Sequence, residues 1–250
     1  MISKAQIKHI RSLKLLKFRK TNGEFVVEGE KMIRELLVSN YKVKALYALP
    51  EWIERIHLQV SSKNIIPEKV SPKELERISS FKTPNQALAV VEIPEHSLKN
   101  IDFNELVLVL DDIQDPGNLG TIIRTAEWFG TKQIVCSKES VDVFNPKVIQ
   151  ATMGSVFRAK VHYINLEKFF AEKVPESTPV YGALLNGKNL YNQKITQNGI
   201  LIIGNESKGI SEAVSKFVKH PVYIPAHPNS KAESLNASVA TAVLLSEFRK

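Results

Sequence analysis

The sequence has very little cysteine and no long apolar run, and both shortages narrow what the protein is. Cys136 is the only cysteine among the 250 residues, so no intramolecular disulfide forms, which fits a reducing compartment. No stretch approaches the roughly 18 apolar residues of a membrane span. The first residues, MISKAQIKHIRSLKLLKFRK, carry charges throughout and lack the apolar region of a secretory signal. We therefore expect a cytoplasmic protein that binds no membrane.

Several signatures of common enzyme classes are also missing. The sequence has no HExxH motif, and a single cysteine cannot build a thiolate zinc site, so we expect no metal. It has neither the GxSxG turn of Ser-His-Asp hydrolases nor the GxGxxG turn of dinucleotide-binding enzymes. A dinucleotide oxidoreductase therefore ranks last among the candidates. The remaining chemistry needs a bound cofactor rather than a cluster of reactive side chains.

What the composition does contain is an excess of positive charge. Lysines and arginines number 34 against 26 acids, a net charge of +8 with a pI near 9.4. Such an excess favours a polyanionic partner, because Lys and Arg displace counterions from phosphates. A basic surface that binds only solvent would have the same composition, so charge alone leaves both interpretations open.

The positive charge is densest near the amino terminus. From Lys4 to Lys20 there is no acidic residue, and apolar residues recur at near-helical spacing. This pattern predicts one amphipathic helix with a cationic outer face, which either contacts RNA phosphates or faces solvent; we slightly favour RNA. The candidate RNA-contacting residues are Lys8, Arg11, Lys14, Lys17, Arg19 and Lys20.

The chain divides into two regions in which strands alternate with helices. In the first, strands are expected at 25–29, 43–50 and 86–93, and helices at 30–40, at 51–60 and after Ser71. Ser71, Pro72 and Glu74 form a capping-box signature for the last of these helices. The expected organisation is a small α/β domain over 1–94, a linker over 95–105 and a second domain over 106–250.

The second region predicts a mostly parallel sheet with helices on both faces. Its expected strands are 106–113, 133–137, 179–185, 199–205 and 220–226, and their near-continuous apolar character indicates burial on both faces. The expected helices start near Gly120, Asn145, Leu166, Ser211 and Ser234.

Three polar loops follow strands in this region and open helices: DPGNLGTIIRTAE, GNESKGIS and IPAHPNSKAESLNASVA. In an open α/β sheet, ligands bind outside the carboxyl ends of the strands, so the three loops predict one composite site. In the second loop, glycines allow a close approach of backbone to a ligand, while Glu206 would orient Arg124 or bind a ligand hydroxyl. An ordinary polar turn is the alternative.

The third loop leads into the terminal helix. Ser234 is a natural N-cap for that helix, and this is the only role that the pattern requires of it. Asn236 is a poor helix former placed in the expected first turn, which favours a side-chain contact there.

The stretches NLGTIIRTAEWFG, LIIGNESKGIS and IPAHPNSKAESLNASVAT resemble the three ordered motifs of the SpoU (TrmH) ribose methyltransferases of the SPOUT superfamily. The resemblance covers about 106–250. The stretch RSLKLLKFRKTNGEFVVEGEKMIREL resembles the L30e-like RNA-binding domain of that family. One departure is the spacer AHPNSKA, which is longer and more polar than is usual in the third motif.

The resemblance implies a deep trefoil knot, bound S-adenosyl-L-methionine and a homodimer whose site draws on both subunits. It implies methylation of a ribose 2′-OH, with ribosomal RNA favoured; transfer RNA is the alternative, as is a non-catalytic RNA-binding or ribosome-assembly protein. The implied catalytic positions are Asn118, Arg124, Glu206, Ser234 and Asn236. The implied cofactor-binding positions are Gly182, Ala183, Leu184, Gly204, Asn205, Gly209, Ile224, Leu235 and Asn236.

Overall fold

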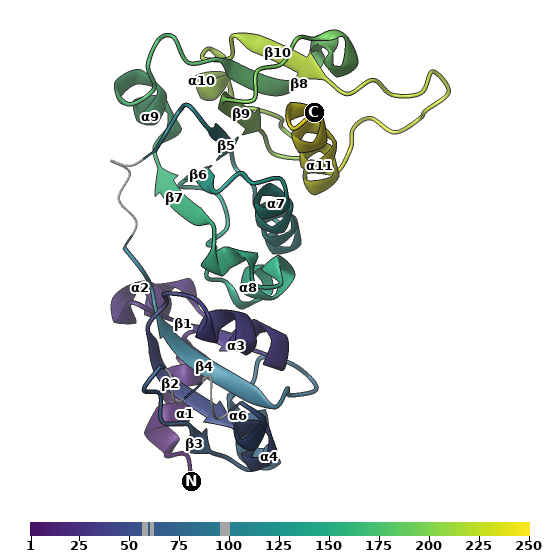
Figure 1. Cartoon of the computed structure of the whole chain (residues 1–250). Helices are drawn as coiled ribbons and strands as arrows, with labels where there is room; N and C mark the ends of the chain where they lie inside the picture. The colour runs from purple at the N-terminus through teal and green to yellow at the C-terminus, as the bar shows by residue number, and fades with distance from the viewer. Residues whose placement is uncertain (57–59, 61–62, 96–100) are drawn as a thin grey trace. The chain divides into compact units, whose positions relative to one another are not determined.

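A computed structural model describes residues 1–56, 60, 63–95 and 101–250, and the chain forms two compact units in it (Figure 1). Unit 1 comprises Met1–Glu95 together with Asp142–Arg158, and unit 2 comprises His96–Val141 and Ala159–Lys250. The expected helix at 51–60 and the expected linker at 95–105 lie partly outside the described residues. The grouping of Asp142–Arg158 with unit 1 is a feature that no local pattern in the sequence indicated.

Unit 1 is built on a four-stranded sheet with the order β1-β4-β2-β3. Its first two pairings are antiparallel and the β2–β3 pairing is parallel. The strands are β1 (Glu24–Glu28), β2 (Val43–Ala48), β3 (Glu68–Lys69) and β4 (Ala87–Glu92). The helices of the unit are α1 (Lys4–Ser12), α2 (Leu16–Asn22), α3 (Glu30–Leu37), α4 (Pro50–Arg55), α6 (Pro72–Ile78) and α8 (Pro146–Thr152), with the 3-10 turn η2 (Ser155–Phe157).

Helices α1 and α6 bury their apolar faces in one core with one side of this sheet, as Ile7, Ile10 and Leu75 pack with Val26 and Val90. The N-cap of α6 is Ser71, with Pro72 in the first turn and both hydrogen bonds of the capping box present, as the sequence predicts. The chain therefore fixes the start of this helix locally.

The predicted single amino-terminal helix is wrong, because the chain turns between α1 and α2. Two local features end α1. The Ser12 hydroxyl donates to the His9 carbonyl at 2.6 Å. The guanidinium of Arg19 donates hydrogen bonds to the carbonyls of Leu13 and Lys14, each at 2.9 Å. A hydroxyl bonded back to its own helix weakens helix continuation, and carbonyls bound by a side chain are lost to the helical ladder.

The break changes which apolar residues are buried. Ile7, Ile10 and Leu13 are buried as the spacing predicts, whereas Leu16 is 43% exposed and Phe18 is 38% exposed. The apolar periodicity therefore describes α1 and fails in α2.

Unit 2 is built on a six-stranded sheet with the order β10-β8-β9-β5-β6-β7, in which every pairing is parallel. The predicted α/β fold with a parallel sheet is confirmed. Its strands are β5 (Leu106–Leu110), β6 (Gln133–Ser137), β7 (Lys160–Ile164), β8 (Val180–Asn189), β9 (Gly199–Ile203) and β10 (His220–Tyr223). Strand β7 was not predicted, because Lys160 and His162 interrupt its apolar pattern; it is an edge strand, and Lys160 is exposed.

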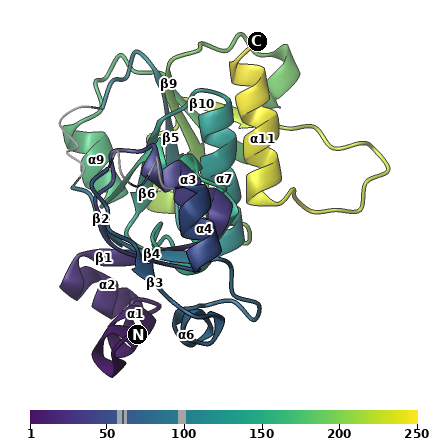
Figure 2. The ribbon, with the colours of Figure 1, turned by 60° about the horizontal axis from the view of Figure 1, so that its bottom comes forward.

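Helices cover both faces of this sheet (Figures 1 and 2). Helices α7 (Pro116–Trp128) and α11 (Ala237–Phe248) lie side by side on one face, and α9 (Leu166–Glu172) and α10 (Glu212–Ser215) lie on the other. Val107 and Ile202 pack with Phe169 and Val214 on the second face. A 3-10 turn, η3 (Leu190–Asn192), follows β8.

Two predicted helix starts need correction. Helix α7 begins at Pro116, before the predicted Gly120, because the Asp115 carboxylate accepts from the Asn118 N–H and caps the helix there. The cap of α11 is Asn236 and not Ser234, since the Asn236 side chain accepts from the backbone of the first turn. The predicted starts of α8, α9 and α10 are confirmed.

Candidate active site

The three polar loops meet at the carboxyl edge of the unit 2 sheet. Strands β5, β9 and β10 are all parallel members of this sheet, so the segments that leave them emerge at one edge. Asn118 lies in the first turn of α7 after β5, Glu206 follows β9, and Asn236 caps α11 after β10. The composite site predicted from the loops is thus brought together by the topology.

A chain of side-chain hydrogen bonds connects the loops. The Oδ1 atom of Asn236 accepts from the N–H groups of Ser238 at 2.9 Å and Val239 at 3.4 Å, so its amide nitrogen points outward from the helix. That nitrogen donates to Asn118 Oδ1 at 2.9 Å. The amide nitrogen of Asn118 then donates to Glu206 Oε1 at 2.5 Å. The donors of the α11 backbone therefore determine the orientation of every group along this Asn236–Asn118–Glu206 relay.

Two acidic residues that sequence reasoning did not single out hold the second loop in place. Asp111 is 5% exposed, and its carboxylate accepts from the Ser211 N–H at 2.8 Å. The carbonyl of Asp112 accepts from the Asn205 side chain at 2.8 Å, and Asp112 adopts a left-handed φ of 59°. A left-handed aspartate two residues after a buried strand is uncommon, and the two consecutive aspartates after an apolar run are the signal in the sequence.

Arg124 lies on the solvent face of α7 and is exposed. The structure pairs Glu206 with Asn118 rather than with Arg124, and within the described residues the Arg124 guanidinium has no hydrogen bond or ion pair. Gly117, Thr121 and Trp128 share this exposed stripe at spacings of three and four residues, and Trp128 is 82% exposed. The five guanidinium donors of Arg124 are therefore free for a ligand.

The predicted cofactor-binding glycines pack closely against the protein itself. A Cβ on Gly204 would lie 2.2 Å from the Gly209 backbone, and a Cβ on Gly182 would lie 2.7 Å from the Val218 side chain. Gly209 has a φ of +70°, which an L residue rarely adopts. Packing therefore requires glycine at positions 182 and 204, and backbone conformation favours it at position 209, whatever they bind.

The other predicted cofactor-binding residues present mixed chemistry at the same edge. Ala183, Leu184 and Ile224 are half-buried, and Leu235 is 46% exposed. The register between β8 and β10 shifts between Pro221 and Val222, so the chain at Ala183 and Leu184 departs from regular pairing. Half-exposed apolar side chains beside amide groups and one carboxylate suit a ligand that combines a purine, a sulfonium and polar edges. The residues present therefore fit S-adenosyl-L-methionine.

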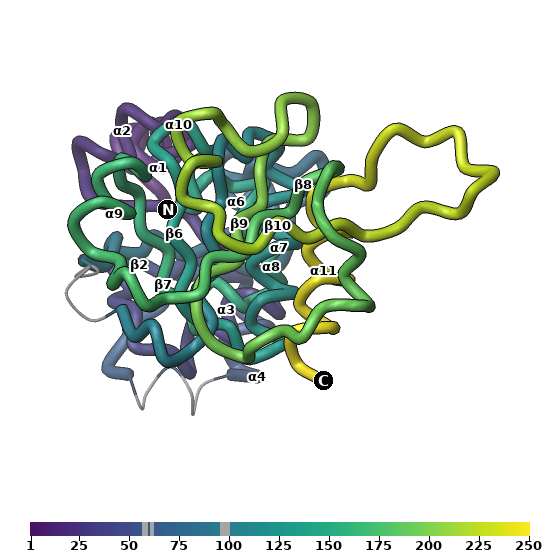
Figure 3. The backbone as a smooth tube through the Cα atoms, turned by 90° about the horizontal axis from the view of Figure 1, so that it is seen from above, coloured from purple at the N-terminus to yellow at the C-terminus, as the bar shows by residue number. Residues whose placement is uncertain are grey.

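Residues 226–236, which include the long spacer, are exposed throughout. In Figures 1 and 3 this segment extends away from the rest of unit 2 before the chain enters α11. Within it, the Ser230 N–H donates to the His227 carbonyl at 2.8 Å. Ser234 lies in this segment, is exposed and does not cap α11, because the cap is Asn236.

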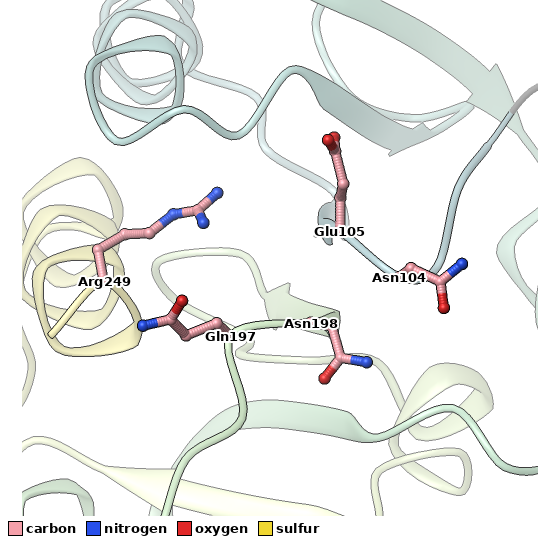
Figure 4. A pocket seen from close by; sticks show the side chains of 5 residues that line it. All are labelled: Asn104, Glu105, Gln197, Asn198 and Arg249. Atoms are coloured by element: carbon pink, nitrogen blue, oxygen red, sulfur yellow. The ribbon is translucent and has the colours of Figure 1, made fainter.

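A polar pocket lies elsewhere in unit 2. It is lined by Asn104 and Glu105 before β5, Gln197 and Asn198 before β9, and Arg249 after α11 (Figure 4). These residues precede the two strands, so the pocket belongs to the amino edge of the sheet. It is separate from the carboxyl edge where the three loops meet.

The candidate RNA-contacting residues of unit 1 fall into two groups. Lys8, Arg11, Lys17 and Lys20 are exposed, and Lys14 is half-buried with its ammonium donating to the Ser79 carbonyl at 3.1 Å. Arg19 requires a correction: it is 2% exposed and is withdrawn from the RNA-contacting set. Its guanidinium is bound to Asp142, with Nη2 at 2.6 Å from the carboxylate and Nε at 2.8 Å.

Other reactive groups contribute little. Burial raises the pKa of the Cys136 thiol, so thiolate chemistry is disfavoured there. Among the described residues, no group of three or more His, Cys, Asp or Glu side chains is placed to hold a metal ion. None of the helices in the described part of the chain is long and apolar enough to span a bilayer.

Comparison with known proteins adds independent findings. Residues 105–246 match the SpoU rRNA Methylase family, and residues 4–89 match the MRM3-like substrate binding domain. The chain is 33% identical over 245 residues to the 23S rRNA (guanosine(2553)-2′-O)-methyltransferase RlmP of Bacillus subtilis, covering 98% of this chain and 96% of that protein.

Two solved structures resemble the whole chain. One is a putative RNA methyltransferase of the TrmH family from Porphyromonas gingivalis, with a TM-score of 0.86 and 36% identity over 100% of this chain and 98% of that one. The other is an AdoMet-bound rRNA methyltransferase from Sinorhizobium meliloti, with a TM-score of 0.88 and 28% identity over 100% of this chain and 96% of that one.

Proposed function

The chain belongs to the SpoU rRNA methylase family, and from that premise we propose that it is an S-adenosyl-L-methionine-dependent methyltransferase of a ribose 2′-OH in ribosomal RNA. The observation that carries the proposal is the Asn236–Asn118–Glu206 relay, which joins three loops, one of which leads into the helix α7 that carries the exposed Arg124. The Bacillus subtilis relative is a 23S rRNA methyltransferase and the Sinorhizobium meliloti structure contains bound AdoMet, which supports the substrate class and the cofactor. A cytoplasmic location is part of the proposal.

The cofactor, when bound, supplies an electrophilic methyl group. The protein must then align the ribose oxygen, which would accept the methyl group as its bond to the cofactor sulfur breaks and would release its proton to solvent water. Alignment of two reacting groups alone contributes up to about 7–11 kcal/mol in favourable cases. In the proposal, Gly204, Asn205, Ile224 and Leu235 hold the cofactor, together with the segment at Gly182–Leu184.

Arg124 positions the nucleotide. Its planar fork of donors binds the phosphate beside the target ribose and polarises the hydroxyl. Arg124 does not act as a general base, because a guanidinium with a pKa above about 12 retains its proton in proteins. The relay keeps Asn118 and Glu206 in fixed orientation in the proposed site, and Ser234, on the exposed segment two residues before Asn236, is proposed to contact the substrate.

A homodimer belongs to the proposal. The solvent face of α7 carries Trp128, 82% exposed, and the neighbouring α11 carries Val239, 49% exposed. Large apolar side chains on adjacent exposed helix faces support an interface with a second copy. The deep trefoil knot and the expected division into an RNA-binding domain over 1–94, a linker over 95–105 and a catalytic domain over 106–250 are proposed with it.

The direct test is transfer of tritium from labelled S-adenosyl-L-methionine to unmodified ribosomal RNA and, separately, to unmodified transfer RNA. With the wild-type chain we expect label on ribosomal RNA, and the phosphodiester bond next to one nucleotide should resist alkaline hydrolysis. With Arg124→Ala we expect no label. Label on transfer RNA alone would show that the substrate is transfer RNA and not ribosomal RNA. Absence of cofactor binding in calorimetry would favour a non-catalytic RNA-binding or ribosome-assembly protein.

A further inference from the structure

Helix α2 presents apolar side chains to solvent in the middle of the most basic part of the chain. Leu15 is 59% exposed, Leu16 is 43% exposed and Phe18 is 38% exposed. We refer to these three residues as the α2 apolar patch. The other large exposed apolar side chains of unit 1 that the structure describes, Met1, Val38 and Ile66, are at least 14 positions away from it in sequence. Three exposed apolar residues within four positions, at the N-cap and in the first turn of α2, need an explanation.

The backbone under the patch is held in place by Arg19. Its Nη1 donates to the carbonyls of Leu13 and Lys14 at 2.9 Å, and the same guanidinium forms the ion pair with Asp142. Leu13 is fully buried and fills the inner position of the turn. Because the turn is fixed from beneath, the patch residues stay outside instead of folding into the core. A pre-positioned apolar surface costs little ordering on binding.

The charges around the patch identify the partner. Lys17 and Lys20 are exposed on the same helix, and no acidic residue occurs before Glu24. Glu24 itself lies 2.7 Å from the His9 ring nitrogen, so its charge is engaged by a neighbour. A partner for this surface must carry negative charge together with flat or apolar surface, and RNA offers both as phosphates and nucleobases.

The form of the RNA follows from what the patch can touch. In an A-form duplex the base faces are stacked against each other, whereas loops, bulges and ends expose them to aromatic side chains. We propose that the α2 apolar patch binds unpaired nucleotides of the substrate RNA, with Phe18 stacking on a base while Lys17 and Lys20 contact the phosphates. This rests on the proposed function, and it specifies that the substrate is recognised at an unpaired segment.

The test compares two RNA probes with the full chain: a fluorescent hairpin with an unpaired loop of about 12 nucleotides, and a fully paired duplex of the same length. Their affinities are measured by fluorescence anisotropy over a series of salt concentrations. We expect Phe18→Ala to weaken hairpin binding roughly 5- to 50-fold and to leave duplex binding and the salt slope unchanged, since stacking is sequence-tolerant and uncharged. Phe18→Trp should retain hairpin binding.

Two matched variants complete the design. Val38→Ala truncates an exposed side chain of the same unit and should change neither affinity. Lys17→Gln with Lys20→Gln should weaken both probes and reduce the salt slope, because phosphate contacts are lost. An unchanged melting temperature of Phe18→Ala would show that the variant remains folded.

Several outcomes would overturn the inference. Hairpin affinity within twofold of wild type in Phe18→Ala, or an equal loss for hairpin and duplex, contradicts base stacking. If Phe18→Ala lost the binding of the wild-type chain to phosphatidylserine vesicles but kept its hairpin affinity, the patch would be assigned to a membrane surface. If Phe18→Ala changed the oligomeric state in ultracentrifugation but kept its hairpin affinity, the patch would be assigned to a second copy of the chain. Methyl transfer by the wild-type chain is scored separately, so failure of the proposed function remains distinguishable from failure of this inference.

Discussion

Two arginines in two regions of the molecule show how differently one residue type is used. Arg19 in unit 1 is 2% exposed and binds Asp142 and two backbone carbonyls. Arg124 in unit 2 is exposed and, within the described residues, has no hydrogen bond or ion pair. The first guanidinium is used for folding, and the second has its donors available for a ligand. Location and partners therefore decide the role of an arginine.

The same contrast holds for the two regions around these arginines. At the carboxyl edge of unit 2, amide and carboxylate side chains are oriented by hydrogen bonds, and glycines pack closely in the same region. The surface of α1 and α2 is cationic with three exposed apolar side chains. We expect changes at the first region to affect reaction rate, and changes at the second to affect stability or RNA affinity.

The largest effect that sharpens this comparison is expected for Arg124→Lys. The change keeps the charge and removes the planar fork, so methyl transfer should fall by roughly 10²–10³-fold, the range seen when an oriented donor is lost at a reacting centre. The measurement is single-turnover methyl transfer at saturating cofactor. The urea midpoint should stay at the wild-type value. A near-normal rate would show that Arg124 acts only as a point charge.

Arg19→Met should produce the opposite profile. Removal of the guanidinium leaves Asp142 partly buried without its partner, and the free energy of unfolding of unit 1 should fall by about 2–4 kcal/mol. Urea unfolding of the full chain measures the loss. Arg11→Met, at an exposed arginine of α1, is the matched control and should change it by less than about 0.5 kcal/mol. Equal effects of both substitutions would refute the anchoring role.

Asn236→Ala tests the relay against the neighbouring serine. It removes both the cap of α11 and the bond to Asn118, so stability should drop by about 1 kcal/mol and methyl transfer should fall with it. Ser234→Ala leaves the cap intact, and stability should change by less than about 0.5 kcal/mol. Thermal melts and methyl transfer are measured for both. A large loss of activity in Ser234→Ala at unchanged stability would establish a direct role for its hydroxyl.

The smallest effect concerns pH and the amino-terminal end of unit 1. Hydrogen bonds from the backbone N–H groups of Ser71 and Ile2 lower the pKa of Glu74 to about 2. Because the pKa of Glu74 is lower in the folded state, its carboxylate stabilises the folded state at pH values above the ordinary glutamate pKa. That contribution disappears as the pH falls towards 2.

Wild type should therefore exceed Glu74→Gln in urea midpoint at pH 7, and the difference should shrink at pH 3. Glu76→Gln, at an exposed glutamate two residues along α6, serves as the control and should change the midpoint little at either pH. A difference between wild type and Glu74→Gln that is constant with pH would show that the carboxylate charge does not matter.

Much of the fold was accessible from local signals. The capping box at Ser71, the strand pattern of β5 and the helix start after Asn145 each depend on a few adjacent residues, and all are confirmed. The three loops could be placed at one edge because parallel strands share a direction. Strand β7 was missed because charged residues on an edge strand break the apolar pattern.

The errors arise where side-chain hydrogen bonds outweigh the apolar pattern. Apolar spacing continues through Leu16 and Phe18, yet Arg19, held by the distant Asp142, bonds the carbonyls of the preceding turn. Ser234 is a good cap by composition, but the helix starts at Asn236. Local preference sets what is possible, and contacts far along the chain choose among the possibilities.

The sequence by itself determined the parallel α/β architecture, the basic amino-terminal segment and the identity of the three loops, because these follow from periodicity, charge and short motifs. Only the tertiary structure decided that Glu206 binds Asn118, that Arg19 is buried against Asp142 and that Phe18 faces solvent. The physical reason is that burial and hydrogen-bond partners depend on residues brought together from 88 and 123 positions apart, which no local pattern encodes.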